Sequence, residues 1–318
     1  MIRYVLQRIL LLIPIVLGVS FIVFSILELT PSDPGRLILG QNAEQKDVDE
    51  LNRRLGYDRP FFIRYLTYIK DAVTKFEFGR SYVTQRPVVN EIKAMFPTTL
   101  KLALLGVMTA SLIGIPLGVM AAVKQYSAGD NIASVLAMLI AAVPEFWLGM
   151  MFILVFGLFL GWLPTFGATS WRHFILPVFT MAIPSAAKIL RMTKSTMLET
   201  IRQDYIRTAR AKGQKERIVI FRHALKNAVL PIINMVGTQF GLLLGGSVLI
   251  ESVFSLPGLG TLVVNAIRRK DIPQVLATVI FIASLFCFIL LMVDLLFAFM
   301  DPRIKAKYIR IKNRRIQE

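Results

Sequence analysis

Six long apolar runs constrain this chain more than any other feature of its sequence. They cover residues 9–29, 99–123, 132–160, 174–192, 228–250 and 275–299. A helix crosses a bilayer core of about 30 Å with about 20 apolar residues, so each run is long enough to span a membrane. The runs lack the alternation of barrel strands, and lipid offers no water to an open backbone. We therefore predict an all-α integral membrane protein with six transmembrane helices.

The composition agrees with a membrane protein. Of the 318 residues 55% are hydrophobic, which is above the share of ordinary soluble domains. The first apolar run follows Arg3 and Arg8, as in a signal peptide, but no small-residue cleavage site follows it and five further runs do. We expect an uncleaved first helix.

Lysine and arginine near the ends of the runs predict the orientation. They are concentrated in the loop after the fourth run and in the segment after Asp301. Such basic loops stay in the cytoplasm, so six spans also place the N-terminus inside. Residues 30–98, 161–173 and 251–274 are then expected outside.

These boundaries divide the chain into four parts. We expect an N-terminal segment with the first helix, an extracytoplasmic loop region, a five-helix core that includes a loop at 199–226, and a basic cytoplasmic tail. The parts are residues 1–30, 31–98, 99–300 and 301–318.

The net charge of +17 raises the question of a nucleic-acid partner. The basic residues lie mainly beside the apolar runs, where they set topology and contact anionic lipid, so we expect a lipid partner and no nucleic acid. Cys287, the only cysteine, lies inside the last run, which predicts neither a disulfide nor a thiolate zinc site. Phosphate-loop, metalloprotease and serine-hydrolase motifs are missing from the sequence. We expect no catalytic residue, metal or cofactor in this chain, and an energy source in a partner.

Residues 199–231 form a basic segment between two apolar runs. Glu199 to Lys212 contain no proline or glycine, and Gly213 stands where a helix needs a left-handed cap residue. We predict a short cytoplasmic helix that ends at Gly213. The residues alone allow two interpretations: a helix that holds lipid headgroups, or a docking surface for a cytoplasmic protein.

Short motifs along nearly the whole chain carry a resemblance to a known family. In the basic segment, Ala209 to Gly213 read Ala-Arg-Ala-Lys-Gly, and Arg-His-Ala and Asn-Ala-x-x-Pro follow. The other motifs are Pro31-Ser32-Asp33-Pro34, Leu55-Gly56-Tyr57-Asp58-Arg59-Pro60, Phe78-Gly79-Arg80-Ser81, Pro144-Glu145-Phe146-Trp147, Gly161-Trp162-Leu163-Pro164, Glu251-Ser252-Val253-Phe254, Pro257-Gly258-Leu259-Gly260 and Asp301-Pro302-Arg303. In this order and spacing they resemble the dipeptide and oligopeptide permeases of ABC importers. Arg207-Thr208-Ala209 departs from the Glu-Ala-Ala triplet of ABC importers in general, sharing only the last alanine.

The resemblance implies a type I ABC importer permease architecture, with a long extracytoplasmic loop after the first helix and a coupling helix between the fourth and fifth. It implies three kinds of protein partner: a homologous second permease subunit, two ATPase subunits or domains that bind ATP and Mg, and an extracytoplasmic substrate-binding protein. The implied location is the plasma membrane of a bacterium or archaeon. Di- or oligopeptides are the expected cargo, with nickel chelates, glutathione and oligosaccharides as alternatives.

The resemblance also assigns the coupling role to one stretch. Its residues are Arg207, Thr208, Ala209, Arg210, Ala211, Lys212 and Gly213. We expect Ala209, Ala211 and Gly213 to fit a groove on the ATPase, and the basic residues to pair with its acidic side chains.

Other candidate residues lie in the apolar runs and outer loops. Glu145 in the third run is a possible pathway residue, since a charge in lipid normally faces protein or water. Gly237, Gly241 and Gly245 form a small-residue ladder that lines either a packing seam or the pathway, and Ala110, Gly114, Gly118 and Ala122 form another. A re-entrant turn at the outer mouth, a gate or a contact for the binding protein, is predicted from Glu251, Phe254, Pro257, Gly258 and Gly260.

Two other functional classes fit the sequence less well. A secondary carrier would need its own coupling-ion site and usually an internal repeat, and the two halves of the sequence show no repeat. A membrane-embedded enzyme would need paired catalytic residues at one depth, which the scattered carboxylates do not provide.

Overall fold

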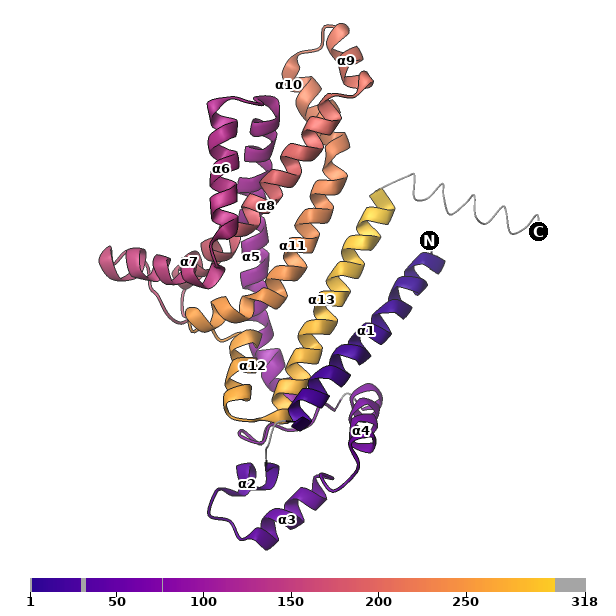
Figure 1. Ribbon diagram of the computed structural model, residues 1–318, viewed down its shortest axis with the longest axis vertical. Coiled ribbons are helices and arrows are strands. Elements are labelled where there is room, and N and C mark those ends of the chain that lie inside the picture. Colours follow the sequence, from indigo (N-terminus) through magenta and orange to yellow (C-terminus); the bar gives the residue numbers. More distant parts are fainter. Residues whose placement is uncertain (1, 30–32, 76, 301–318) are drawn as a thin grey trace, which may run out of the picture.

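Long helices dominate the computed structural model of the chain (Figure 1), which describes residues 2–29, 33–75 and 77–300. Five helices reach the length and apolar character of membrane spans. They are α1 (Ile2–Leu29), α5 (Val88–Val123), α8 (Ile175–Ile201), α11 (Leu225–Val253) and α13 (Ile272–Met300). The predicted tail at 301–318, with its Asp-Pro-Arg motif, and Pro31 and Ser32 lie outside the described residues.

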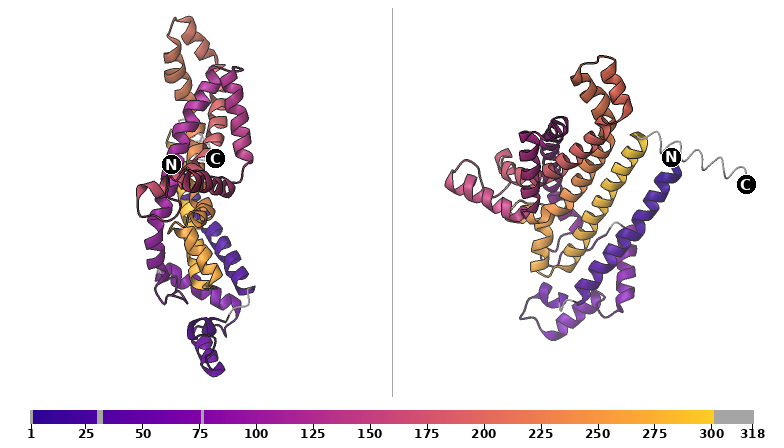
Figure 2. Two further views of the ribbon diagram at one scale, coloured as in Figure 1. Left: turned by 90° about the vertical axis from the view of Figure 1, so that its left-hand side faces the viewer. Right: turned by 45° about the horizontal axis from the view of Figure 1, so that its top comes forward.

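The sequence predicted one transmembrane helix for the third apolar run, but the run is broken into two arms. It divides into α6 (Ala128–Ala142) and a second arm, α7 (Glu145–Phe152) with the π-helix η1 (Ile153–Phe159), and the two arms meet at 100°. Val143 is extended, as a residue before proline prefers, and Pro144 begins the next helix. The six-span count holds if this bent pair is counted as one span, and α7 projects sideways from the bundle (Figure 2).

The membrane helices pack side by side. The closest pair is α5 with α8, followed by α8 with α11 and α11 with α13, and α1 lies along α13 (Figures 1 and 2). The ladder on α5 forms the first of these seams: a Cβ on Gly114 would lie 2.7 Å from the Ala186 carbonyl, and one on Gly118 would lie 2.7 Å from the Leu190 carbonyl. Glycine therefore lets the two backbones approach closely.

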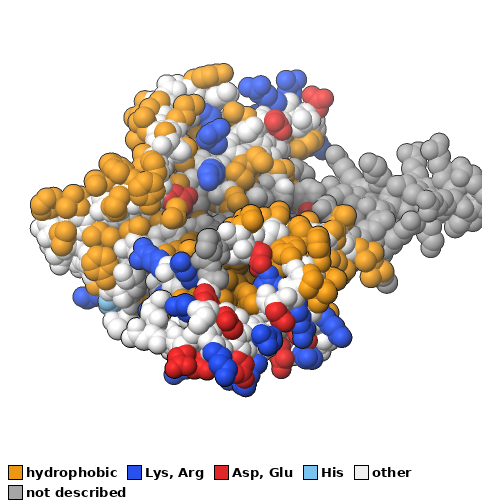
Figure 3. Space-filling view, turned by 60° about the horizontal axis from the view of Figure 1, so that its bottom comes forward, with side chains coloured by type: hydrophobic (Ala, Val, Ile, Leu, Met, Phe, Trp, Pro, Cys, Tyr) orange, Lys and Arg blue, Asp and Glu red, His pale blue; other side chains and the backbone are white. Residues whose placement is uncertain are grey.

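The two ends of the bundle differ. The segment between α1 and α5, which we expect outside and call the outer segment, contains α2 (Pro34–Leu39), α3 (Gln45–Arg54) and α4 (Phe61–Thr74). α12 (Leu259–Arg268) lies beside it at the same end (Figure 1). α5 begins inside the segment expected to be a loop. Charged side chains of both signs gather at this end, while hydrophobic side chains cover the flanks (Figure 3). The opposite end carries α9 (Asp204–Ala211), α10 (Glu216–Ile218) and the π-helix η3 (Val219–Ala224).

Candidate functional site

The predicted coupling segment forms a separate short helix at the far end of the molecule. The chain leaves α8 at Ile201, turns at Arg202 and Gln203, and re-enters helix at Asp204. The continuous helix expected from Glu199 to Lys212 is therefore wrong, because the direction changes between α8 and α9. Gly213 has φ of +74°, which confirms the left-handed conformation predicted after the helix.

One face of α9 packs against the chain itself. Ile206 and Ala209 are buried in an apolar cluster that includes Met197, Val219 and Ile220. The expectation that Ala209 enters a groove on a partner is wrong, since the side chain is covered from within. The other residues of the stretch are exposed: Arg207, Thr208, Arg210, Ala211, Lys212 and Gly213. Asp204 and Tyr205 at the start of the helix are exposed too, and Asp204 lies 3.7 Å from Arg207. The stretch thus presents basic and small residues on a base of buried apolar ones.

Two side-chain contacts hold the turn after α9. Arg210 donates two hydrogen bonds to Glu216, with Nε–Oε2 and Nη2–Oε1 distances of 3.1 and 2.6 Å. This contact raises the pKa of Arg210. Gln214 Oε1 lies 2.8 Å from His223 Nε2 on η3. The turn is therefore tied both to α10 and to η3, which leads directly into α11.

At the opposite end, the predicted outer-mouth residues surround a buried carboxylate. Glu251 in the last turn of α11 is fully buried. Its Oε1 accepts hydrogen bonds from Thr99 Oγ1 at 2.7 Å and Ser247 Oγ at 3.0 Å. Its Oε2 accepts the backbone N–H groups of Gly260 at 2.7 Å and Thr261 at 3.3 Å. One carboxylate thus joins α5, α11 and the N-terminus of α12.

Two glycines make room for this carboxylate. A Cβ on Gly258 would lie 2.3 Å from the carboxyl carbon of Glu251, and a Cβ on Gly260 would lie 2.3 Å from Val248 Cα. Gly258 is also the N-cap residue of α12 and has no side chain that could accept a hydrogen bond from the first turn. The Glu251 carboxylate accepts those hydrogen bonds instead. The predicted re-entrant turn contains a helix of its own, α12, because the carboxylate satisfies the free N–H groups of its first turn.

Phe254 and Pro257 complete this cluster at the outer mouth. Phe254 is buried and packs on Gly149 of α7, while Leu256 after it is also buried. Pro257 and Gly258 line an open cavity of about 440 Å³ on the outer side of the turn. The gate or docking role of this cluster stays a prediction.

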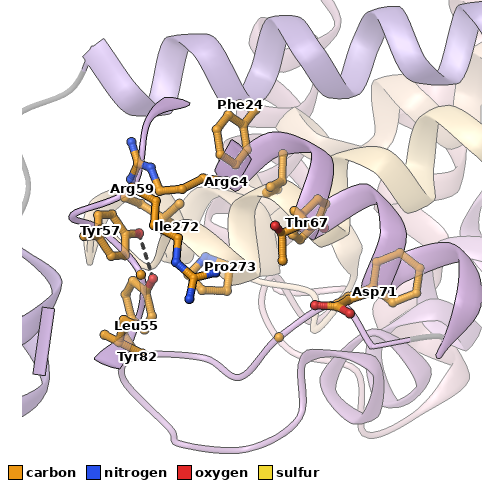
Figure 4. A pocket seen from close by; sticks show the side chains of 15 residues that line it. Phe24, Leu55, Tyr57, Arg59, Arg64, Thr67, Asp71, Tyr82, Ile272 and Pro273 are labelled. Carbon is orange, nitrogen blue, oxygen red and sulfur yellow. Dashed lines mark hydrogen bonds between the residues drawn. The ribbon is translucent and has the colours of Figure 1, made fainter. Parts of the chain in front are cut away.

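Sequence analysis missed the contacts that fix the outer segment to the bundle. Asp271, before α13, is buried and accepts hydrogen bonds from the Ser81 hydroxyl and from Tyr82 N at 3.0 Å. The Phe-Gly-Arg-Ser motif marked Ser81, but no local pattern links it to Asp271. A cavity of about 220 Å³ lies next to this contact, with the Tyr57 and Tyr82 hydroxyls 2.8 Å apart on its wall (Figure 4). Burial raises the pKa of both tyrosines.

The candidate pathway residues lie in different settings. Glu145 is half-buried in the first turn of α7, at the bend, rather than inside a continuous span. A Cβ on Gly237 would lie 2.3 Å from Val293 Cγ2, and one on Gly241 would lie 3.2 Å from Phe286, so both glycines face α13. Nothing lies within 4 Å of a Cβ built on Gly245. The ladder on α11 forms a packing seam at its first two members, and a pathway-lining role remains an untested prediction.

One side of α8 carries a track of exposed polar residues. Exposed residues recur at every third or fourth position from the middle of the helix to its end at α9: Lys188, Arg191, Ser195, Glu199 and Arg202. Lys188 and Arg191 lie within the last five residues of the apolar run at 174–192, and charged side chains inside a membrane span normally face protein or water. This face of α8 is therefore unsuited to lipid.

Among the residues that the structure describes, no group of three or more histidine, cysteine, aspartate or glutamate side chains could hold a metal ion. The geometry instead provides a basic exposed helix at one end and a polar helix face in between. At the other end is the buried Glu251 carboxylate with its four hydrogen bonds, which we call the latch.

Comparisons with known proteins agree with this arrangement. Residues 114–306 match the family described as "Binding-protein-dependent transport system inner membrane component", and residues 1–103 match the corresponding N-terminal family. The glutathione transport system permease protein GsiC of Escherichia coli strain K12 is 40% identical over 307 residues, which cover 96% of this chain and the full length of that protein. GsiC of Shigella flexneri serotype 5b shows the same identity and coverage.

Two solved structures share the fold at low identity. A chain of the methionine ABC transporter MetNI has a TM-score of 0.58 at 17% identity, over 66% of this chain and 96% of that one. A chain of an amino acid ABC transporter has a TM-score of 0.52 at 18% identity, over 68% and 94% of the two chains. Together with the two family matches, which reach almost every part of the sequence, these findings show that the chain belongs to the binding-protein-dependent transport system inner membrane components and is a permease subunit of the ABC importer type.

Proposed function

We propose that this permease subunit imports short peptides, glutathione included. The observation that carries the proposal is the 40% identity to GsiC over the whole length of that protein. Glutathione is itself a tripeptide, so a glutathione permease and a peptide permease handle the same chemistry: a flexible chain with amide groups, an ammonium and free carboxylates. The proposal therefore joins the expected peptide cargo with glutathione, which the sequence analysis gave as an alternative.

The mechanism that we propose assigns the energy source to partners. Two ATPase subunits or domains bind ATP and Mg and contact the exposed face of α9. A substrate-binding protein delivers the peptide at the outer mouth, and a homologous second permease completes the pathway. The buried base of α9 and the ties from Arg210 to Glu216 and from Gln214 to His223 support this role, because they link α9 firmly to η3 and α11.

The position of α9 supports a protein partner over lipid. The exposed face of α9 and its turn carries Arg207, Lys212 and Lys215, which acidic side chains on an ATPase would match. The helix is joined to α8 at a sharp turn and stands at the tip of the molecule (Figure 1). A helix held by lipid headgroups would instead lie along the bilayer surface.

Uptake in cells tests the cargo. A strain without this chain, and the same strain with a restored copy, would be given radiolabelled glutathione and a labelled α-linked tripeptide. Unlabelled peptide, a nickel chelate and an oligosaccharide would serve as competitors. We expect uptake of at least one labelled peptide to fall on deletion, to return with the restored copy and to be competed only by peptide. Competition by the nickel chelate or the oligosaccharide alone would overturn the peptide assignment.

A further inference from the structure

The polar track on α8 begins at the midpoint of a helix that is otherwise mostly buried. Lys188 and Arg191 are exposed, whereas their neighbours Ala187, Ile189 and Leu190 are buried. The two basic residues are three positions apart and therefore lie on one face, one turn apart. This part of the bundle leaves exposed the face of α8 that is least compatible with hydrocarbon.

A third basic residue of α8, by contrast, is paired with an acidic residue of the same chain. Lys194 forms an ion pair with Asp130 on α6 and a hydrogen bond of 3.0 Å with Ser134 Oγ. Within the described part of the chain, Lys188 and Arg191 form no such ion pair. Two cationic groups thus remain available to an anion from outside this chain.

The space beside these two groups is large enough for a ligand. A cavity of about 460 Å³ opens between α8 and α11 and is lined by Lys188, Arg191, Met192, Ser195 and Met235. Small-molecule sites commonly have volumes in this range, with apolar walls and a few convergent polar groups. The carboxylate of Glu145 is close enough to Lys188 to interact electrostatically, so opposite charges lie at the end of the track that is farther from α9.

We propose that Lys188 and Arg191 form an anion-binding point in the translocation pathway, where they take a carboxylate of the peptide cargo. The arrangement of charges then matches a peptide, with Glu145 facing its ammonium group and the two basic residues facing a carboxylate. Methionine side chains on the wall adapt to different side chains of the cargo. The inference rests on the proposed import function and names the part of the cargo that this chain recognises.

The first test needs no cargo and measures whether Lys188 and Arg191 attract anions to the cavity. Cys287→Ala removes the only cysteine of the chain, and Ser195→Cys then places a single thiol on the track. In membrane vesicles with the full complex, its labelling rate would be measured with a negatively charged and a positively charged methanethiosulfonate. Lys188→Gln with Arg191→Gln removes both cations, and Lys70→Gln with Lys93→Gln removes two exposed lysines elsewhere as a matched control.

We expect both reagents to label Ser195→Cys, and the ratio of the anionic to the cationic rate to fall about 10-fold on loss of Lys188 and Arg191. The control pair should leave the ratio unchanged. An unlabelled thiol would show that lipid or the second permease covers this face, and an unchanged ratio would show that the cations do not act on the cavity. Either result overturns the proposal.

A second test concerns the cargo itself. The Lys188→Gln, Arg191→Gln pair should lower uptake of a peptide with a free carboxylate about 10-fold more than uptake of the same peptide with an amidated C-terminus, each measured relative to wild type. Equal losses would overturn the assignment. If the wild type imports neither peptide, the proposed cargo is wrong, and the labelling result still decides whether the track binds anions.

Discussion

The Glu251 carboxylate joins three helices at one end of the bundle. It accepts hydrogen bonds from two hydroxyls and two backbone N–H groups, and it stands where Gly258 has no capping side chain. A buried acceptor of this kind is costly to remove, because the donors left behind have no water to bond.

Removal of this carboxylate should destabilise the protein in a graded way. Glu251→Ala leaves the N–H groups of Gly260 and Thr261 unpaired and should lower the free energy of unfolding by at least about 2 kcal/mol. Glu251→Gln keeps one oxygen for those groups and should cost less. Thermal unfolding of the purified protein in detergent would measure the series, with the exposed neighbour in Ser252→Ala as a control that changes stability by about 0.5 kcal/mol or less. An equal effect of Glu251→Ala and Ser252→Ala would contradict the latch.

At the scale of residues, the sequence identified which residues belong to the cluster around Glu251 more completely than the contacts that they make. The family resemblance marked Glu251, Gly258 and Gly260 as one cluster, and the structure brings them together. Thr99 could not be predicted, because it is far away in sequence and no local pattern connects a threonine on α5 with a glutamate on α11. Ser81 and Asp271 escaped prediction for the same reason.

Among the elements, the α5–α8 seam is where side-chain volume matters most. Gly118→Ala would place a Cβ 2.6 Å from Thr193 Cβ and 2.7 Å from a backbone carbonyl, so the helices must separate. We expect a loss of about 1–3 kcal/mol of stability. Gly245→Ala is the matched control, since nothing lies within 4 Å of its Cβ. Unfolding in detergent would measure both, and equal stability of the two variants would show that the seam is not tightly packed.

The turn after α9 tests the coupling role. Gly213 has φ of +74° and donates its N–H to the Arg210 carbonyl at 2.9 Å, and proline allows neither. We expect Gly213→Pro to reduce peptide uptake at least about 10-fold while the complex still inserts and hydrolyses ATP. Gly213→Asn keeps the left-handed conformation at low cost and should retain most of the uptake. Normal uptake by Gly213→Pro would show that this turn does not couple the two events.

Helix positions were predictable from apolar length, whereas breaks in helices were not. Each of the six runs falls on a membrane helix or on the bent pair, because burial in lipid needs a minimum length. Proline inside α5, α8 and α11 leaves those helices continuous, but Pro144 coincides with a 100° bend. The presence of a proline therefore does not by itself predict a break, since it occurs in both settings.

For the whole molecule, the arrangement of its two ends predicts an orientation. We propose that α9 lies in the cytoplasm and α2 to α4 lie outside. In a Cys287→Ala background, an impermeant thiol reagent added to intact cells should label Asp58→Cys, between α3 and α4, and not Lys212→Cys; after the cells are opened, both should react. Labelling of Lys212→Cys in intact cells would reverse the topology and remove α9 from the reach of any ATPase.

The polar face of α8 also belongs to this scale, because one chain does not cover it. Mid-helix cations, an open cavity and an acidic group nearby are what half of a pathway would present to a second permease and to cargo. A continuous wall of apolar side chains, by contrast, would suit only lipid.

The measurement that tests the central claim most directly is transport by the reconstituted complex. Proteoliposomes would contain this chain with its second permease and ATPases, with the binding protein and labelled peptide on the outer side. We predict accumulation of peptide that requires internal ATP and the binding protein and is unaffected by collapse of ion gradients. Accumulation without ATP that stops when an ion gradient is collapsed would identify a secondary carrier and contradict the account.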